Sequence, residues 1–119
     1  MEEDLKRARA LLSEKRLGFA IQETEPNPSP DTVGAIAGIT FLAEQPDVQA
    51  TVYIFEEWPD DDDIDPLLAP YIPDDDAVYS RTASNGTLFF FAKTRLDSPY
   101  GRRAEDRLDE MLSAFSGSE

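Results

Sequence analysis

The chain has 119 residues, of which 40% are hydrophobic, and its 25 acidic and 11 basic side chains give a formal net charge of −14. This length accommodates one domain, 1–119, with a single hydrophobic core. Cysteine and histidine are both absent, which excludes disulfides, thiolate chemistry and histidine-dependent proton transfer, and we expect no cofactor.

The N-terminal part of the chain indicates a helix and then a short strand. Apolar residues at helical spacing predict a helix over 3–16, because acids precede them and bases follow, as the helix dipole favours. Gly18 is a stop signal. Alternation that begins at Phe19 and includes Gln22 predicts a short strand ending before Pro26, and the prolines within residues 27–31 predict a stiff polar connection.

Two strands are expected next. Residues 33–43 carry apolar side chains on both faces, and Gly34 and Gly38 within them indicate close packing. Residues 48–57 alternate strictly, so that Val48, Ala50, Val52 and Ile54 share one face of a strand. A turn at 45–47 is short enough to join the two strands into a hairpin.

The following segment predicts a short helix and a second hairpin. Asp65-Pro66 has the pattern of an N-cap followed by proline at the first helical position, for a helix that reaches Ile72. Asn85-Gly86 separates the strand-like runs 77–83 and 87–95. This dipeptide is the strongest local signal for a tight hairpin, because both residues tolerate positive φ.

The last element is an amphipathic helix over 100–115, opened by Ser98-Pro99. The whole order predicts an α+β domain: a mostly antiparallel sheet of four to five strands, with the N- and C-terminal helices packed on one face. Aromatic side chains then point to the other face, where they form an open binding surface unless the short helix around 67–72 covers them. We favour coverage, because monomers seldom expose such a patch. These side chains are Tyr53, Phe55, Phe89 and Phe91.

Most of the negative charge lies in one segment, which we expect to be a solvated acidic loop over about 56–76. It contains ten acids and no base, whereas the rest of the chain has fifteen acids and eleven bases, a charge of −4. Such a surface repels phosphate and anionic lipid, so we expect no direct binding to nucleic acid. It instead offers a partner surface for a protein or small ligand, made of Trp58, Asp60, Asp62, Asp74, Asp75 and Asp76.

The same aspartates raise the alternative of a divalent-cation site. Asp61, Asp63 and Asp65 have the alternate spacing that opens an EF-hand loop, and hard cations such as Ca²⁺ take oxygen ligands. The remainder of the motif is missing, because Pro66 occupies the glycine position and Ile72 the position of the closing glutamate. Two further interpretations are salt adaptation, in which high charge keeps the protein soluble, and mimicry of nucleic acid by an inhibitor.

Catalysis has little support in this sequence. The serines have no histidine partner, no Ser-x-x-Lys motif occurs and no glycine-rich phosphate loop is present. Carboxylates in an exposed run lack the burial that raises the pKa of a catalytic acid. We therefore expect a non-enzymatic protein.

One resemblance is visible in the strands. The segments Thr51–Glu56 and Asn85–Phe91, followed by an amphipathic C-terminal helix, resemble a loose group of small uncharacterised bacterial proteins, many of them lipoproteins or otherwise exported. The resemblance covers roughly residues 36–115, and the aspartate insert departs from the pattern. It implies an α+β fold and export, with no activity or site residues.

No segment of this sequence is expected to cross a membrane, because its longest apolar-rich run falls well short of the ~20 residues required. The acidic start Met1-Glu2-Glu3-Asp4 is not a signal peptide. The compartment therefore stays open between an extracytoplasmic protein whose leader is omitted and a cytoplasmic one. The sequence predicts an uncharacterised, soluble binding or interaction domain with a salt-tolerant acidic surface.

Overall fold

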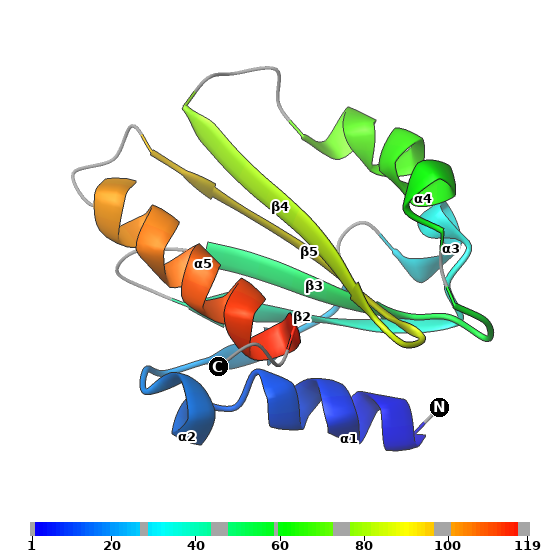
Figure 1. Cartoon of the computed structure of the whole chain (residues 1–119), viewed down its shortest axis with the longest axis horizontal. Coiled ribbons are helices and arrows are strands. Elements are labelled where there is room, and N and C mark those ends of the chain that lie inside the picture. Colours follow the sequence, from blue (N-terminus) through cyan, green and yellow to red (C-terminus); the bar gives the residue numbers. More distant parts are fainter. Residues whose placement is uncertain are drawn as a thin grey trace.

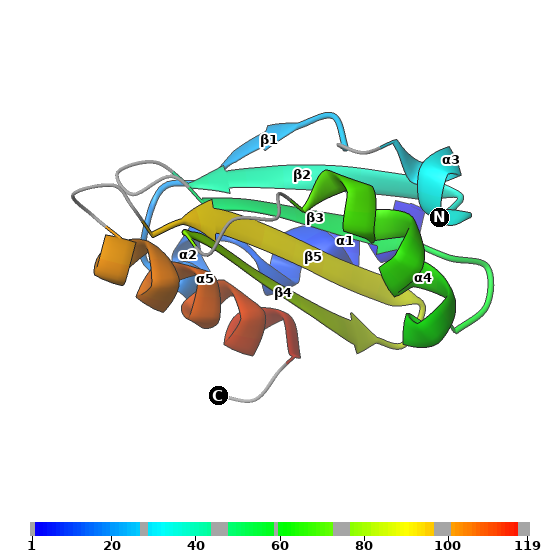
Figure 2. The ribbon, with the colours of Figure 1, turned by 90° about the horizontal axis from the view of Figure 1, so that it is seen from above.

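The computed structural model describes residues 2–26, 29–43, 48–58, 60–72, 77–96 and 101–116. Within these ranges it shows one five-stranded antiparallel sheet, in the order β1-β2-β3-β5-β4, with helices on both faces (Figures 1 and 2). The predicted α+β class is confirmed. The strands are β1 (Gln22–Thr24), β2 (Ala37–Ala43), β3 (Val48–Ile54), β4 (Val78–Asn85) and β5 (Leu88–Arg95). The helices are α1 (Glu2–Leu11), α2 (Glu14–Leu17), α3 (Pro30–Val33), α4 (Asp61–Leu68), the 3₁₀ turn η1 (Ala69–Tyr71) and α5 (Gly101–Ser116).

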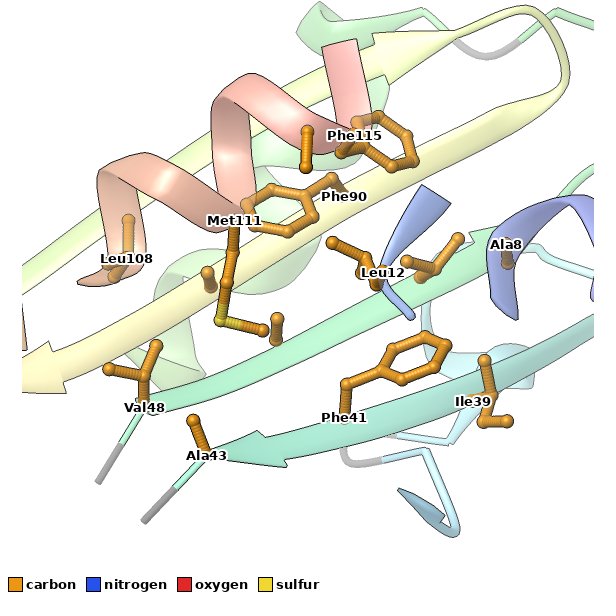
Figure 3. Packing of buried hydrophobic residues seen from close by; sticks show 14 of the residues in the cluster. Ala8, Leu12, Ile39, Phe41, Ala43, Val48, Phe90, Leu108, Met111 and Phe115 are labelled. Atoms are coloured by element: carbon orange, nitrogen blue, oxygen red, sulfur yellow. The ribbon is translucent and has the colours of Figure 1, made fainter. Parts of the chain in front are cut away.

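The main hydrophobic core lies between the sheet and the two terminal helices. Ala8 and Leu12, from α1 and the turn that follows it, and the apolar stripe of α5 pack against alternate residues of β2, β3 and β5 (Figure 3). The rings of Phe90 and Phe115 lie 5.1 Å apart between centroids. Both terminal helices therefore cover the same face of the sheet, as the sequence predicts.

A second, smaller core covers the opposite face. Ile64 and Leu68 of α4 and Val33 of α3 pack against Tyr53, Phe89 and Phe91, whose side chains are at most 2% exposed. The expectation that the short helix covers these aromatic residues is confirmed. They do not form an open surface.

The N-terminal helix differs from its prediction. The structure has two helices in place of one over 3–16, and Leu17 donates its N–H to the Ser13 carbonyl (2.9 Å) at the start of α2. Serine favours the first position of a helix, and the change of direction lets Leu17 and Phe19 pack against the main core. The short strand expected from Phe19 and ending before Pro26 is present as β1, but it begins only at Gln22, where its residues pair with β2.

Helix α3 was not predicted and replaces the start of the expected strand at residue 33. Ser29-Pro30 opens it with the same cap-then-proline pattern found elsewhere in the chain, and Gly34 ends it with φ of +78°. Gly34 is thus a helix stop and makes no close contact, contrary to the packing role predicted for it. Gly38 does have that role, because a Cβ there would lie 3.1 Å from both Pro26 and Tyr53.

The second hairpin is confirmed, with its turn displaced by one residue. Asn85 pairs with Leu88, which leaves Gly86 and Thr87 as the two loop residues. Gly86 has φ of +64°, the conformation that favours glycine at the first loop position. The last helix is described as far as Ser116, and its expected cap at Ser98-Pro99 and its expected end at Gly117 lie outside the described residues.

Candidate functional site

The aspartate run begins with a helix, which corrects the prediction of an acidic loop over 56–76. Asp60 is the N-cap of α4, and its Oδ1 accepts a hydrogen bond from the N–H of Asp62 (3.0 Å). The cap is therefore Asp60 and not Asp65, and Pro66 lies inside the helix. Acidic side chains in the first helical turn are favoured by the dipole, so the aspartates themselves promote the helix.

Helix α4 also changes the interpretation of the aspartates as a cation site. Successive alternate residues of an α-helix are rotated by about 200°, so Asp63 and Asp65 lie on different sides of α4. The side chain of Asp61 lies outside the described atoms. Among the described residues, no three acidic side chains are close enough to hold a metal ion.

Helix α4 is held by its apolar side and by one polar contact. Ile64 and Leu68 are buried in the second core, while the Lys93 ammonium donates to the Tyr71 carbonyl (3.1 Å) in η1. Leu67 and Tyr71 remain 44% and 39% exposed. The remaining described side chains of α4 point away from the sheet, so the helix presents a charged outer face.

Trp58 is the most exposed large hydrophobic residue that the structure describes, at 81% of its side-chain surface. It lies between β3 and α4, and it does not anchor that segment against the core. Its described neighbours in sequence on both sides are exposed acids. We call this surface the acidic end; it consists of Glu56, Glu57, Trp58, Asp60, Asp62 and Asp63.

The acidic end lies beside the β4–β5 hairpin. Phe55 donates its N–H to the Thr87 carbonyl in the hairpin loop (2.9 Å), which ties the end of β3 to that loop. Figure 1 shows the segment that leads to α4 at the same end of the molecule as the hairpin. The structure thus brings together Trp58, Asp60 and Asp62 of the predicted partner surface. Asp74, Asp75 and Asp76 of that prediction lie outside the described residues.

Sequence reasoning missed a polar contact on the other side of the sheet. The Tyr79 hydroxyl donates to Asp109 Oδ1 (2.6 Å), and the Arg81 guanidinium lies 4.0 Å from the centre of the Tyr79 ring. The hydrogen bond to Asp109, with burial and the charges of Asp109 and Glu105, raises the pKa of Tyr79 above its ordinary value. Thirty residues separate Tyr79 from Asp109, so no local pattern could have revealed the pair.

Asn85 connects three elements and was predicted only as a turn residue. Its Nδ2 donates to the Phe115 carbonyl at the end of α5 (2.8 Å), and its Oδ1 accepts from the Arg7 guanidinium of α1. Asn85 therefore ties the hairpin to both terminal helices. This arrangement is structural and offers no chemistry for a reaction.

The comparisons with known proteins add no family to this geometry: no protein-family model matches the chain, and no curated protein or solved structure matches it. None of the described helices is both long and apolar enough to cross a membrane.

Proposed function

We propose that this protein is a non-enzymatic binding domain that recognises a partner protein through the acidic end. The observation that carries the proposal is Trp58, 81% exposed and surrounded in sequence by exposed carboxylates. Tryptophan dominates binding energies at protein interfaces, because it buries a large area with few rotatable bonds. An exposed tryptophan surrounded by negatively charged side chains is therefore suited to bind a partner protein.

The charge of the acidic end supports a basic partner. The ten acids of the segment 56–76 have no base among them, so they attract cationic groups and raise the rate of association at low salt. Arginine or lysine side chains can in addition lie over the indole of Trp58. The same charges oppose direct contact with nucleic acid.

A divalent-cation site built on Asp61, Asp63 and Asp65 is the weaker proposal. Alternate residues of helix α4 point to different sides of the helix, whereas a Ca²⁺ ion requires six to eight converging oxygen atoms. A nucleic-acid mimic also has less support, because no regular spacing of carboxylates like that of phosphates is present along the segment.

The proposal can be tested through Trp58, which is the only tryptophan of the chain. The probe is a decapeptide of alternating lysine and serine, and the readout is the emission of Trp58. We expect saturable binding that weakens about tenfold in Asp62→Asn/Asp63→Asn, a loss of roughly 1.4 kcal/mol. The matched control, Asp106→Asn/Glu110→Gln, removes the same charge from exposed positions of α5.

We expect the control variant to bind like the unchanged protein. Equal weakening of both variants would mean that only the total charge matters, and it would contradict a site at the acidic end. Ca²⁺ at equal ionic strength serves as a second probe. Saturable Ca²⁺ binding lost in the α4 variant would favour the cation site.

A further inference from the structure

Strand β4 is the last strand of the sheet, and the register shows which of its backbone groups lie on the outer edge. Just beyond the pair Val78↔Arg95, Leu96 donates its N–H to the Ala77 carbonyl (2.6 Å). Backbone groups of successive residues in an antiparallel strand point to opposite edges. Odd-numbered residues of β4 therefore bond to β5, and the groups of Val78, Ser80, Thr82 and Ser84 point away from the sheet.

Among the residues that the structure describes, nothing pairs with the hairpin half of this edge. The Ser80 carbonyl accepts a hydrogen bond from Arg81 Nη1 (2.7 Å). In the part of the chain that the structure describes, no group bonds to the outward N–H and C=O of Thr82 or Ser84, and both residues are exposed. Two donors and two acceptors thus remain available along about 7 Å of strand.

The two edges of the sheet differ in how they are protected. Proteins guard free edges with short strands, charges, prolines or bulges. Strand β1, at the other edge, has three residues, and its Glu23 forms an ion pair with Arg9 (2.9 Å). Strand β4 has eight residues in unbroken register, without proline or acid. Arg81 is its single charged residue.

Acidic side chains flank this edge on both faces of the sheet. Thr82 and Ser84 pair with Phe91 and Phe89, which α4 covers through Ile64 and Leu68. Helix α4 therefore lies over β5, the strand next to this edge, and its described aspartates are exposed. On the other face, Asp109 bonds to Tyr79, and Glu105 lies one turn earlier on α5.

We infer that β4 is a strand-addition site at which an extended segment of a basic partner protein pairs with Thr82 and Ser84. Alternate side chains of an added strand point to opposite faces, so basic residues meet the α4 acids on one face and the α5 acids on the other. The inference deepens the proposed function and rests on it for the charge of the partner. Pairing with the sheet edge requires that the partner segment bind in an extended conformation.

A second copy of this chain is a poorer occupant of the same edge. Pairing of β4 with β4 would place two copies of α4 on one face of a continuous sheet. Each copy carries a net charge of −14, and like charges brought close together oppose association. The negative charge next to the β4 edge thus favours a positively charged strand from a partner protein over a second copy of this chain.

The test uses an octapeptide of repeated Lys-Lys-Thr-Thr, which places lysines on both faces of an added strand, and the variants Thr82→Pro and Thr82→Ala. Proline removes the outward N–H of Thr82 and is tolerated at an edge where that N–H faces solvent. We expect Thr82→Pro to weaken binding about tenfold, a loss of roughly 1.4 kcal/mol. Thr82→Ala, which keeps the N–H, binds like the unchanged protein.

Amide hydrogen exchange of the unchanged protein gives a measurement that does not depend on a variant. We expect the peptide to slow exchange at Thr82 and Ser84 about tenfold or more, whereas the amides of Tyr79 and Ala83 already face β5. Unchanged exchange at Thr82 and Ser84, or equal binding by the proline and alanine variants, would overturn the inference. A dimer of the free protein that Thr82→Pro abolishes would overturn it in favour of a second copy.

The two proposals fail separately. If the peptide changes the emission of Trp58 but Thr82→Pro has no effect, the acidic end binds without strand addition. If protection appears at Thr82 and Ser84 while the α4 variant and its α5 control bind equally, the edge pairs with the peptide and the acidic end is not the site.

Discussion

At the scale of single residues, the tyrosine–carboxylate contact of Tyr79 shows how one side chain joins an edge strand to a helix. The hydroxyl of Tyr79 reaches Asp109 at 2.6 Å while its ring packs at the border of the main core. A hydrogen bond to a charged acceptor contributes more than a neutral one, although exposure to water reduces its net value. The contact therefore stabilises the pairing of α5 with β4.

We expect Tyr79→Phe to lower the free energy of unfolding by about 1 kcal/mol at neutral pH. The phenol must be protonated to donate, and its pKa is raised in the folded protein. The stabilisation is therefore complete below the unfolded pKa of about 10 and is lost as the pH rises through the higher folded value. Urea unfolding of both proteins between about pH 7 and pH 11.5 measures the difference.

Tyr53 also has a raised pKa, mainly because it is buried, but it is present in both proteins and cancels in the comparison. Asp109→Asn serves as a control, because it removes the charge at position 109 while the amide oxygen still accepts the hydrogen bond from the Tyr79 hydroxyl. A difference between the unchanged protein and Tyr79→Phe that stays constant above pH 10 would contradict this explanation.

At the scale of elements, the start of α4 shows that a helix can form within a run of like charges. Each aspartate repels its neighbours, but those in the first turn interact favourably with unpaired backbone N–H groups. The cap at Asp60 satisfies one of these groups directly. The net charge of the run and the helix are thus compatible, because the acids gather at the positive end of the helix.

The contribution of this cap can be separated from the charge of Asp60. We expect Asp60→Ala to cost about 1 kcal/mol relative to Asp60→Asn, because both variants lose the charge and only asparagine retains a cap. Chemical denaturation at moderate salt gives both free energies of unfolding. Equal stability of the two variants would show that the side chain of Asp60 does not support α4.

Elements with strong local patterns could be predicted from sequence, and those set by pairing could not. Strand β3 and helix α5 follow strict periods of two and about 3.6 residues, and the structure has both. Ser29-Pro30 carries the same cap-then-proline signal as the predicted helix starts, whereas Ser13 has no proline after it; α2 and α3 were both missed because they have only four residues each. For α4, the Asp65-Pro66 pattern predicts a start that is too late in the chain. In the structure Asp60 is the cap, and the aspartates before Pro66 already belong to the helix.

At the scale of the whole molecule, charge is distributed unevenly between the two faces. Helices α1, α2 and α5 carry acids and bases together, whereas the segment 56–76 carries ten acids and no base. Self-repulsion within such a segment destabilises the compact state, and salt reduces it by shortening the screening length.

We expect the melting temperature to rise when NaCl increases from about 0.05 M to about 1 M, over which the Debye length falls from about 14 Å to about 3 Å. The rise should be smaller in Asp62→Asn/Asp63→Asn than in Asp106→Asn/Glu110→Gln, since the latter pair lies among bases on α5. Calorimetry over the salt series provides the measurement. Identical salt dependence in the two variants would contradict repulsion centred on α4.

The amino-acid order alone was sufficient for the α+β class, the antiparallel hairpins, the helix pair on one face and the coverage of the aromatic residues. The elements and hairpins follow from local periodicity and turn chemistry, which act between near neighbours, and their layering follows from the general tendency of a sheet to bury its apolar faces. The helical start of the aspartate run, the exposure of Trp58, the Tyr79–Asp109 contact and the outer edge at Thr82 and Ser84 became visible only in the folded chain. They depend on which distant segments meet and which backbone groups find a partner, and no short stretch of sequence contains that information.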